Sequence, residues 1–432
     1  MLLIYTHKIT PRFTYTMRQL FMRILGVEIS FTTKVEDFIK HSGPKITYTK
    51  QSLQNEFFVR SNDLLFEQGI NDLEINVRDW DGVPCFFGAG ERSNIPFDIF
   101  SASFYMLSGY EEYLPHLKDE HGRFPPKESL AYQNGFLQLP VVDIWANKLL
   151  HCLKERFPDL EYKRKKYRFM SAINVTTSHS YAYRGLVRSV AGLFYDLGYL
   201  RFGRVLERIK VWFYPQKDPF DNFSLLIQWH KKFQVKSMFF FQFASYSTYD
   251  KNISVNNNKF KFLIKSIGDY STIALAASYS SFGDIELLKK EKKNLAAVIN
   301  RSVDGTRMRY NRVDLPHTYR NLIEAGFTDD YTMGYTHEIG FRAGTCTPFY
   351  FYDISLEIQQ PVRVHPFALQ DYALVHLKNT QEILLQITAL YDEVKKVNGD
   401  FTIVFSNELL GGTSHKVDWK NLYETIIKTY NV

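Results

Sequence analysis

The chain has 432 residues, more than the roughly 250–300 at which a single hydrophobic core stops growing, so two domains are expected. Its 53 Lys and Arg against 46 Asp and Glu give a net charge of +7, but the basic residues are scattered apart from a short cluster at 161–168, which disfavours a nucleic-acid binder. Three widely separated cysteines without a C-x-x-C pair exclude a disulfide framework and a thiolate zinc site, and they fit a reducing compartment.

The sequence contains no sign of membrane insertion. It has no run of about 18 apolar residues, the length that crosses a bilayer. The apolar run at residues 1–4 is too short for the core of a signal peptide. We therefore expect a cytoplasmic protein, and no oligomeric state follows from these patterns.

The first third mixes short strands with helices. Apolar residues recur three and four positions apart in 14–25 and again from Pro96 onward, which predicts two helices. The polar, proline-containing stretch 118–132 is typical of a loop. Further segments predict strands at 2–5, 45–49, 56–59 and 74–77 and a helix from Asp143 to Phe157. We place a boundary near 160–167 and expect a mixed α/β domain over 1–163.

From Tyr167 onward, strands, loops and helices alternate. The continuous apolar run VKSMFFFQFASY (235–246) is typical of a strand buried on both faces in a parallel sheet. Other strands are predicted at 169–175, 271–280 and 401–408, with helices at 257–270, 283–300, 317–327, 380–397 and 419–430. About seven such units predict an α/β fold in 164–432, a complete or incomplete (β/α) barrel. Functional residues of such a barrel follow the carboxyl ends of its strands.

Aromatic residues are abundant, at 16% of the chain with 36 Phe and 28 Tyr. Aromatic side chains bury the largest area per residue, and they also form surfaces on which sugar rings stack. Core packing is the simpler interpretation.

Several long segments resemble one known family. In chain order they are PFDIFSASFYMLSGYEEYL (96–114), DEHGRFPPKESLAY (119–132), LPVVDIW (139–145), PHTYRNLIEAGFTDDYTMGY (316–335), GFRAGTCTPFYFYD (340–353) and VHPFALQDYAL (364–374). They resemble a subfamily of the polysaccharide deacetylases, in which an extra domain precedes an irregular (β/α) barrel. The resemblance covers nearly the whole chain. It implies a metal-dependent hydrolase that removes N- or O-acetyl groups from carbohydrate polymers.

The resemblance implies a demanding site. In such enzymes one carboxylate and two imidazoles hold a divalent cation such as zinc, which polarises the acetyl carbonyl and lowers the pKa of a bound water. A second carboxylate takes the proton of that water, and a later histidine protonates the leaving amine.

The matching positions of this chain lack those groups. Asn174 stands at the position of the base and Thr176 at that of the acidic ligand, yet an amide has no useful proton affinity and a hydroxyl is a poor ligand for zinc. Ala276 or Ala277 replaces an imidazole, and Ser406 replaces the general acid. The resemblance therefore predicts a pseudoenzyme.

Arg342 is retained within the FRAG motif, where the family uses an arginine to orient its catalytic carboxylate. Two interpretations stay open for this chain. Its guanidinium either binds an anionic group of a ligand bidentately or pairs with Asp329 or Asp330.

A relocated metal site is the alternative to a lost one. Its candidate ligands near strand-end loops are His179, His337, His365, Glu338, Asp371 and Glu408, although their spacing has no ligand signature. In the run SHSYAYRG, the side chains of Tyr181, Tyr183 and Arg184 either stack on a sugar ring or cover the barrel mouth.

The predicted pocket gathers residues from the strand ends. It comprises Asn174, Thr176, His179, Ser278, Tyr279, Arg342, Asp371 and Asn407. Because the replaced positions have lost charges and imidazoles while Arg342 kept its charge, the pocket should prefer an anion to a metal. We predict a polysaccharide-deacetylase-like protein of carbohydrate or cell-surface polysaccharide metabolism that binds carbohydrate or a partner, without a cofactor. The alternative is an active, zinc-dependent deacetylase with relocated ligands.

Overall fold

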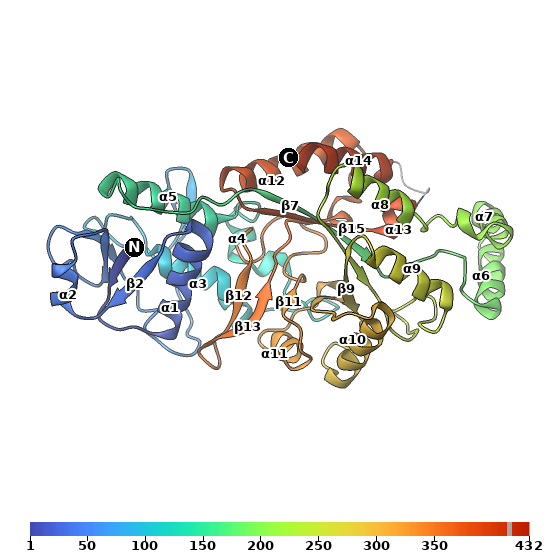
Figure 1. Ribbon diagram of the computed structural model, residues 1–432, viewed down its shortest axis with the longest axis horizontal. Helices are drawn as coiled ribbons and strands as arrows, with labels where there is room; N and C mark the ends of the chain where they lie inside the picture. The colour runs from blue at the N-terminus through green and yellow to red at the C-terminus, as the bar shows by residue number, and fades with distance from the viewer. Residues whose placement is uncertain (413–416, 432) are drawn as a thin grey trace.

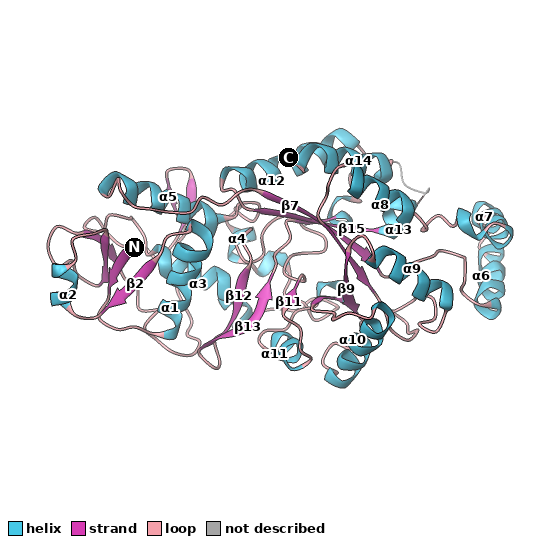
Figure 2. Ribbon diagram, in the orientation of Figure 1, coloured by secondary structure: helices cyan, strands magenta, loops and turns pink. Residues whose placement is uncertain are grey.

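The computed structural model describes residues 1–412 and 417–431. It is an α/β protein with two principal sheets, one built from residues 2–60 and the other from residues 168–406 (Figure 1). The α/β class predicted from the sequence is therefore confirmed. Figure 2 separates the helices from the strands, and the long second sheet lies in the middle of the molecule.

The first sheet has four parallel strands in the order β2-β1-β3-β4. They are β1 (Leu2–Tyr5), β2 (Ile29–Thr32), β3 (Lys45–Thr49) and β4 (Phe57–Arg60), with an antiparallel pair β5 (Arg78–Trp80) and β6 (Val83–Cys85) outside the sheet. The helical segments of this part are α1 (Pro11–Met17), η1 (Arg18–Leu25), α2 (Val35–Lys40), α3 (Ile99–Ser108), η2 (Tyr110–Tyr113), η3 (Pro126–Glu128), α4 (Leu130–Gln133) and α5 (Val141–Arg156).

Local sequence explains where these helices begin and end. Thr10 caps α1 by accepting the N–H of Phe13, and Pro11 occupies the first helical position. Asp98 caps α3, which ends at Gly109 in the left-handed conformation (φ 63°). Two predictions need correction. The expected strand at 74–77 is absent because pairing begins only at Arg78, and the helix expected over 14–25 changes at Arg18 into a π-helix.

The second sheet has nine strands in the order β12-β13-β11-β10-β9-β8-β7-β15-β14. All neighbours are parallel except β12, which runs antiparallel to β13. The strands are β7 (Arg168–Val175), β8 (Ser237–Phe241), β9 (Thr272–Ala277), β10 (Gly305–Met308), β11 (Asp329–Asp330), β12 (Phe349–Asp353), β13 (Ile358–Val364), β14 (Leu369–Gln370) and β15 (Asp400–Ser406). The edge strands β12 and β14 do not pair, so the expected barrel is open.

Helices lie outside this sheet and follow its strands (Figure 1). They are α6 (Leu186–Gly198), α7 (Phe202–Phe213), α8 (Phe223–Lys232), α9 (Asn258–Gly268), α10 (Ile285–Ile299), α11 (His317–Glu324), α12 (Thr380–Lys396), α13 (Asn407–Gly411) and α14 (Trp419–Tyr430), with short 3-10 turns η4 (Pro215–Lys217), η5 (Arg309–Asn311) and η6 (Asp371–Leu374). The helices predicted from 257 onward are confirmed, whereas α6, α7 and α8 were not anticipated.

Alternate residues of the parallel strands face a small enclosed interior. Its apolar members are Ala172, Phe240, Ala274, Ala276, Tyr331, Phe367 and Val404, all at most 6% exposed. Side chains of a strand alternate between its faces, so Asn174 of β7 and Ser406 of β15, each two positions beyond one of these residues, lie on the same face as the interior. The strand ends thus present small polar groups above an apolar floor.

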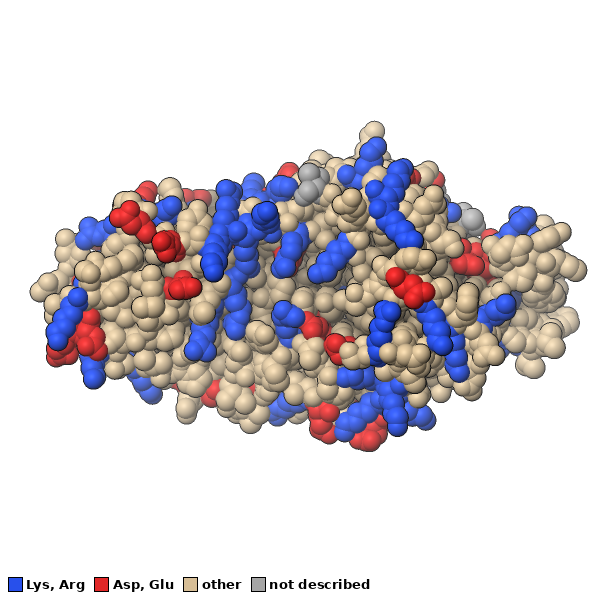
Figure 3. Space-filling view, viewed as in Figure 1, with Lys and Arg blue, Asp and Glu red and all other residues tan. Residues whose placement is uncertain are grey.

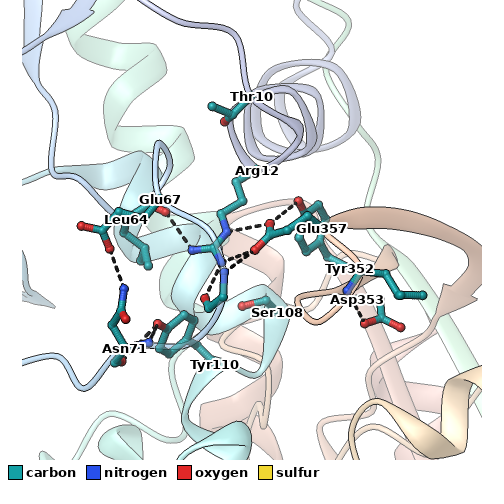
Figure 4. A network of polar contacts seen from close by, with 12 residues as sticks. Thr10, Arg12, Leu64, Glu67, Asn71, Ser108, Tyr110, Tyr352, Asp353 and Glu357 are labelled. Atoms are coloured by element: carbon teal, nitrogen blue, oxygen red, sulfur yellow. Dashed lines mark hydrogen bonds and ion pairs between the residues drawn. The ribbon is translucent and has the colours of Figure 1, made fainter.

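The two sheets are joined through buried ion pairs. Arg12 of α1 is 1% exposed and binds both carboxylate oxygens of Glu357, which lies in the turn between β12 and β13 (Figure 4). The same guanidinium donates to the carbonyl oxygen of Leu64 at 3.0 Å, while Tyr352 donates to Glu357 at 3.0 Å. The network holds α1 against the β12–β13 hairpin.

Candidate functional site

The carboxyl ends of the parallel strands form one edge of the sheet, where the sequence places its candidate residues. After β7, the four residues Thr176–His179 are all buried, none more than 7% exposed. Thr176 donates its hydroxyl hydrogen to Glu408 at 2.7 Å, and the Ser178 hydroxyl donates to Asn252 at 3.1 Å. Hydrogen bonds therefore join this polar cluster to the loop after β8 and to α13, which follows β15.

His179 is the last residue of this buried run. Its Nδ1 is 3.2 Å from the Ser178 hydroxyl, and its Nε2 is 4.0 Å from a carboxylate oxygen of Asp221. Burial lowers the pKa of His179, although Asp218 and Asp221 oppose that shift. The imidazole is thus neutral near pH 7 and held among carboxylates of the segment that follows α7.

Ser406 and Asp371 meet at the ends of β15 and β14. One carboxylate oxygen of Asp371 accepts the backbone N–H of Ser406 at 2.6 Å and its hydroxyl at 2.7 Å. Asp371 is fully buried, and burial raises its pKa to about 6 against the effect of these hydrogen bonds. Asn174 pairs in register with Ser406, so three of the predicted site residues are neighbours.

The remaining predicted pocket residues split between two places. Ser278 donates its N–H to the buried Glu291 at 3.1 Å, and Tyr279 donates its N–H to Asp250 at 3.0 Å. Asn407 donates to the carbonyl oxygen of Thr177 at 3.0 Å, which links β15 to the loop after β7. These contacts join the loop after β9 to the loop after β8, and the end of β15 to the loop after β7.

Arg342 has a different partner from those expected. It donates two hydrogen bonds to Glu112 of η2, at 2.8 and 2.6 Å, and its side chain is 2% exposed. Burial alone would lower the pKa of Arg342, but the paired carboxylate outweighs it and raises that pKa. The expected pairing with Asp329 or Asp330 is wrong, because Asp329 binds His365 and Arg363 while Asp330 binds Thr332 and Tyr319.

The segment around Arg342 joins the two parts of the chain. Asp143 of α5 accepts the hydroxyls of Thr345 and Thr347, each at 2.6 Å, and the N–H of Cys346 at 3.0 Å. Phe341 donates its N–H to Leu137 at 2.8 Å. Residues of the stretch GFRAGTCTPF, one of the segments on which the family resemblance rests, thus make their polar contacts largely with the N-terminal part.

Sequence reasoning missed a second arginine that lies inside the sheet. Arg307 of β10 is 2% exposed and pairs in register with Ala276. It donates to Asn311 at 2.6 Å and to Gln370 at 2.8 Å, and its guanidinium lies 4.4 Å from the centre of the Phe367 ring. Burial lowers its pKa to about 10, and Asp330 and Asp371 limit the shift. The alternation of β10 places Arg307 inward, but the sequence shows no partner for it.

An aromatic cluster covers the ends of β8, β9 and β10. The rings of Tyr249 and Tyr279 stack with centroids 4.1 Å apart, and His121 stacks on Tyr310 at 4.6 Å. His121 meets the other two rings edge to face, at 6.2 and 5.9 Å. Arg312 lies 4.2 Å from the Tyr279 ring centre. Four segments far apart in the sequence thus build one aromatic wall.

The cluster keeps polar groups free for a ligand. Tyr249 is 41% exposed, and in residues 1–412 and 417–431 none of the three tyrosine hydroxyls makes a hydrogen bond. Tyr310 and Asn311 both have positive φ angles, 57° and 53°, a conformation that non-glycine residues adopt at some cost. Such backbone is common at binding sites, where the surrounding structure holds it.

Several buried amide oxygens at this edge lack a partner within the described residues. They are Oδ1 of Asn174, Oε1 of Gln242 and Oδ1 of Asn407. An unpaired buried acceptor costs about 1–3 kcal/mol unless water or a ligand satisfies it. The strand ends therefore offer hydrogen-bond acceptors to a polar molecule.

The residues at the family's metal positions do not fit a divalent cation. They supply an amide at Asn174, a hydroxyl at Thr176 that already donates to Glu408, and a methyl group at Ala276. In the part of the chain that the structure describes, no three His, Cys, Asp or Glu side chains come together in a geometry for a metal. His365 binds Asp329 at 2.7 Å and stacks on Tyr331, while His337 is exposed and the partial burial of its ring lowers its pKa.

Comparison with known proteins gives a family model and distant structures. Residues 2–158 match a family described as a family of unknown function, DUF7033. No curated protein matches the chain. The chain aligns with a protein described as a polysaccharide deacetylase from Mycobacterium smegmatis, at 14% identity and a TM-score of 0.41, over 63% of this chain and 88% of that one.

Two further solved structures align with a similar share of the chain. One is described as a polysaccharide deacetylase from Pseudomonas aeruginosa PAO1, at 11% identity and a TM-score of 0.39, covering 61% of this chain and 84% of that one. The other is Puue allantoinase, at 13% identity and a TM-score of 0.37, covering 62% and 86%. Similarity this low carries no conclusion about activity.

Proposed function

We propose that this protein binds a carbohydrate polymer at the carboxyl ends of β8, β9 and β10. In this proposal it acts in carbohydrate or cell-surface polysaccharide metabolism and lacks the metal site of the deacetylases. The observation that carries the proposal is the wall of His121, Tyr249, Tyr279 and Tyr310. Aromatic faces bind the apolar faces of sugar rings, and the adjacent hydroxyls and Arg312 supply hydrogen bonds to sugar hydroxyls.

Two other observations support this proposal. The sequence resembles polysaccharide deacetylases over most of its length, which favours a glycan over other polymers. The unpaired acceptors of Asn174, Gln242 and Asn407 suit the hydroxyl and amide donors of an acetylated sugar. Cleavage is not part of the proposal, because Asn174 and Ser406 stand where the resemblance implies a base and an acid.

The test is binding of N-acetylated and N-deacetylated chitosan oligomers, measured by calorimetry on the full chain. Replacing Tyr249 with Ala should weaken binding about 2- to 12-fold, since it removes a stacking ring worth about 0.5–1.5 kcal/mol. Tyr249→Phe should retain most of the affinity. Tyr132→Ala is the matched control, because Tyr132 is similarly exposed at 38% but lies on α4.

Two results would contradict the proposal. If Tyr249→Ala bound the oligomers as tightly as the unchanged protein does, the aromatic cluster would not be part of the binding site. Release of acetate from the oligomers that a chelator abolishes would favour the deacetylase with relocated ligands.

A further inference from the structure

Helices α6 and α7 form a hairpin that projects from the end of the molecule, at the right of Figure 1. They pack mainly against each other and against η4, which follows α7. Tyr181 anchors the hairpin to the loop after β7 by donating to Glu207 at 3.0 Å and by packing on Val211. The rest of both helices faces outward.

Each helix of the hairpin exposes an apolar stripe. On α6, the stripe contains Val187, Val190, Phe194 and Leu197, which are 84%, 43%, 67% and 38% exposed. On α7, it contains Phe202, Leu206, Ile209 and Phe213, which are 58%, 68%, 37% and 75% exposed. Spacings of three and four residues put each set on one helical face. Exposed apolar stripes of this length mark an interaction surface.

The contact between the two helices is polar. Asp196 of α6 and Arg208 of α7 form an ion pair at 2.6 Å, with side chains 5% and 9% exposed. Ser189 of α6 is also buried, and a Cβ at Gly192 would come within 2.7 Å of the Arg208 guanidinium. A water-soluble hairpin usually buries its larger apolar side chains, whereas this one buries a charged pair beside Val205 and Val211 and exposes both apolar stripes. That arrangement is expected of helices in an apolar solvent.

The charge of the hairpin is complementary to an anionic surface. Residues 184–217 contain seven basic and two acidic side chains. Figure 3 shows the projecting end as mostly uncharged surface, with both basic and acidic side chains at its margin. Tyr195, Tyr199, Trp212 and Tyr214 are 41–63% exposed beside the stripes, and such rings are common at the level of lipid headgroups.

The helices are too short to cross a bilayer. With 13 and 12 residues they extend roughly 20 Å, against a hydrocarbon core of about 30 Å. Indeed, among residues 1–412 and 417–431 no helix combines the length and hydropathy that a membrane span requires. The hairpin has instead the features of interfacial helices, namely apolar aromatic stripes with flanking Arg and Lys.

We propose that α6 and α7 bind the surface of a membrane that contains anionic lipids, with both apolar stripes inserted among the headgroups. The occupant is a lipid surface because the stripes combine with an excess of basic residues and with a buried ion pair between the helices. A second protein chain would need complementary acidic and apolar surface instead. Since Tyr181 joins the hairpin to the loop after β7, membrane binding holds the carboxyl-end edge of the sheet beside the bilayer.

The experiment is co-sedimentation of the full-length protein with vesicles of phosphatidylcholine alone and of phosphatidylcholine with phosphatidylglycerol. We expect binding to the anionic vesicles, at least about tenfold tighter than to the neutral ones and weakened by salt. The variant Phe194→Glu/Leu206→Glu/Phe213→Glu should lose this binding. The control Phe262→Glu/Leu385→Glu, on α9 and α12, replaces residues 70% and 71% exposed and should bind as the unchanged protein does.

Further measurements separate the other occupants. The tryptophan fluorescence of the unchanged protein, to which Trp212 contributes, should shift to the blue and be quenched by brominated lipids. Circular dichroism tests whether both variants fold. Equal binding of the two variants to vesicles would overturn the proposal. The proposal would also be overturned if the unchanged protein did not bind vesicles, whatever its oligomeric state. If it formed a dimer that the triple variant dissociates, a second copy of the chain would be what covers the hairpin.

Discussion

Arg342 donates two parallel hydrogen bonds to Glu112, 230 residues away in the sequence, at 2.8 and 2.6 Å. Both side chains are almost fully buried, at 2% and 6% exposure. The pair crosses from the β12–β13 side of the second sheet to η2 of the N-terminal part. Its charge is therefore used within the protein, and an anionic ligand would have to displace Glu112 to bind Arg342.

The first prediction concerns this pair. Replacing Glu112 with Ala should lower the free energy of unfolding by about 3–5 kcal/mol, because it leaves the Arg342 charge buried without a partner. The double variant Glu112→Leu/Arg342→Met should recover much of that loss, since it removes both charges. Urea unfolding followed by circular dichroism measures both. Equal destabilisation by the single and double variants would contradict an ion-pair role and indicate packing instead.

The second prediction concerns pH. Burial raises the pKa of Glu291 to about 7 from the ordinary 4.5, so the folded protein binds this proton more tightly than the unfolded chain does. The contribution of Glu291 to the free energy of unfolding is therefore fully present below pH 4.5. It is lost as the pH rises to about 7, which lowers the free energy of unfolding by roughly 3 kcal/mol. Glu291→Gln should remove this part of the pH dependence.

Thermal or urea unfolding between pH 4.5 and 8 tests that expectation. The matched control is Glu286→Gln on the same helix, because Glu286 is 80% exposed. It should leave the pH dependence unchanged. Because the pKa of Asp371 is also raised, part of the slope should remain, but a slope as steep in Glu291→Gln as in the unchanged protein would assign the whole effect to other buried carboxyls.

The secondary structure was largely predictable because local patterns determine it. The apolar run at 235–246 and the helical spacing of 380–397 correspond to β8 and α12. Helices α6 and α7 were missed in a region for which no element was predicted, and their apolar stripes face outward. Nothing in a helical period shows whether a stripe is buried or exposed.

The candidate site was less predictable because its contacts are not local. Asn174, Ser406 and Asp371 were expected together and are neighbours, since strand ends of one parallel sheet meet at one edge. Glu112 as the partner of Arg342, and His121 beside Tyr310, come from segments about 190 to 230 residues apart. Only the packing of the N-terminal part on the sheet brings them together.

The third prediction concerns metal binding. The substitutions Asn174→Asp, Thr176→Asp and Ala276→His restore both carboxylates and one of the two metal-binding imidazoles that the family resemblance implies. Even so, we expect only weak zinc binding by this triple variant, because Arg307 pairs in register with Ala276 and its positive charge would oppose the cation. Adding Arg307→Met should increase zinc affinity at least about tenfold. Equilibrium dialysis with zinc compares the two variants, and tight binding by the triple variant alone would contradict the role given to Arg307.

The last prediction concerns Gly340, which opens the GFRAGTCTPF segment. Its φ is +133°, a conformation that side chains rarely adopt, and a Cβ there would overlap the carbonyl oxygen of Leu137. Phe341 donates its N–H to that same oxygen, so the overlap is with backbone that is held in place. Gly340→Ala should therefore lower the free energy of unfolding by several kcal/mol and loosen the contact between the two parts of the chain.

Gly283→Ala is the matched control. Gly283 also has a positive φ, of 82°, but has open space around its Cβ position, so this substitution should lower the free energy of unfolding by only about 1 kcal/mol. Urea unfolding, with limited proteolysis in the 157–167 segment, compares the two variants. If Gly340→Ala were no less stable than Gly283→Ala, this segment would not be held by close contact with Leu137.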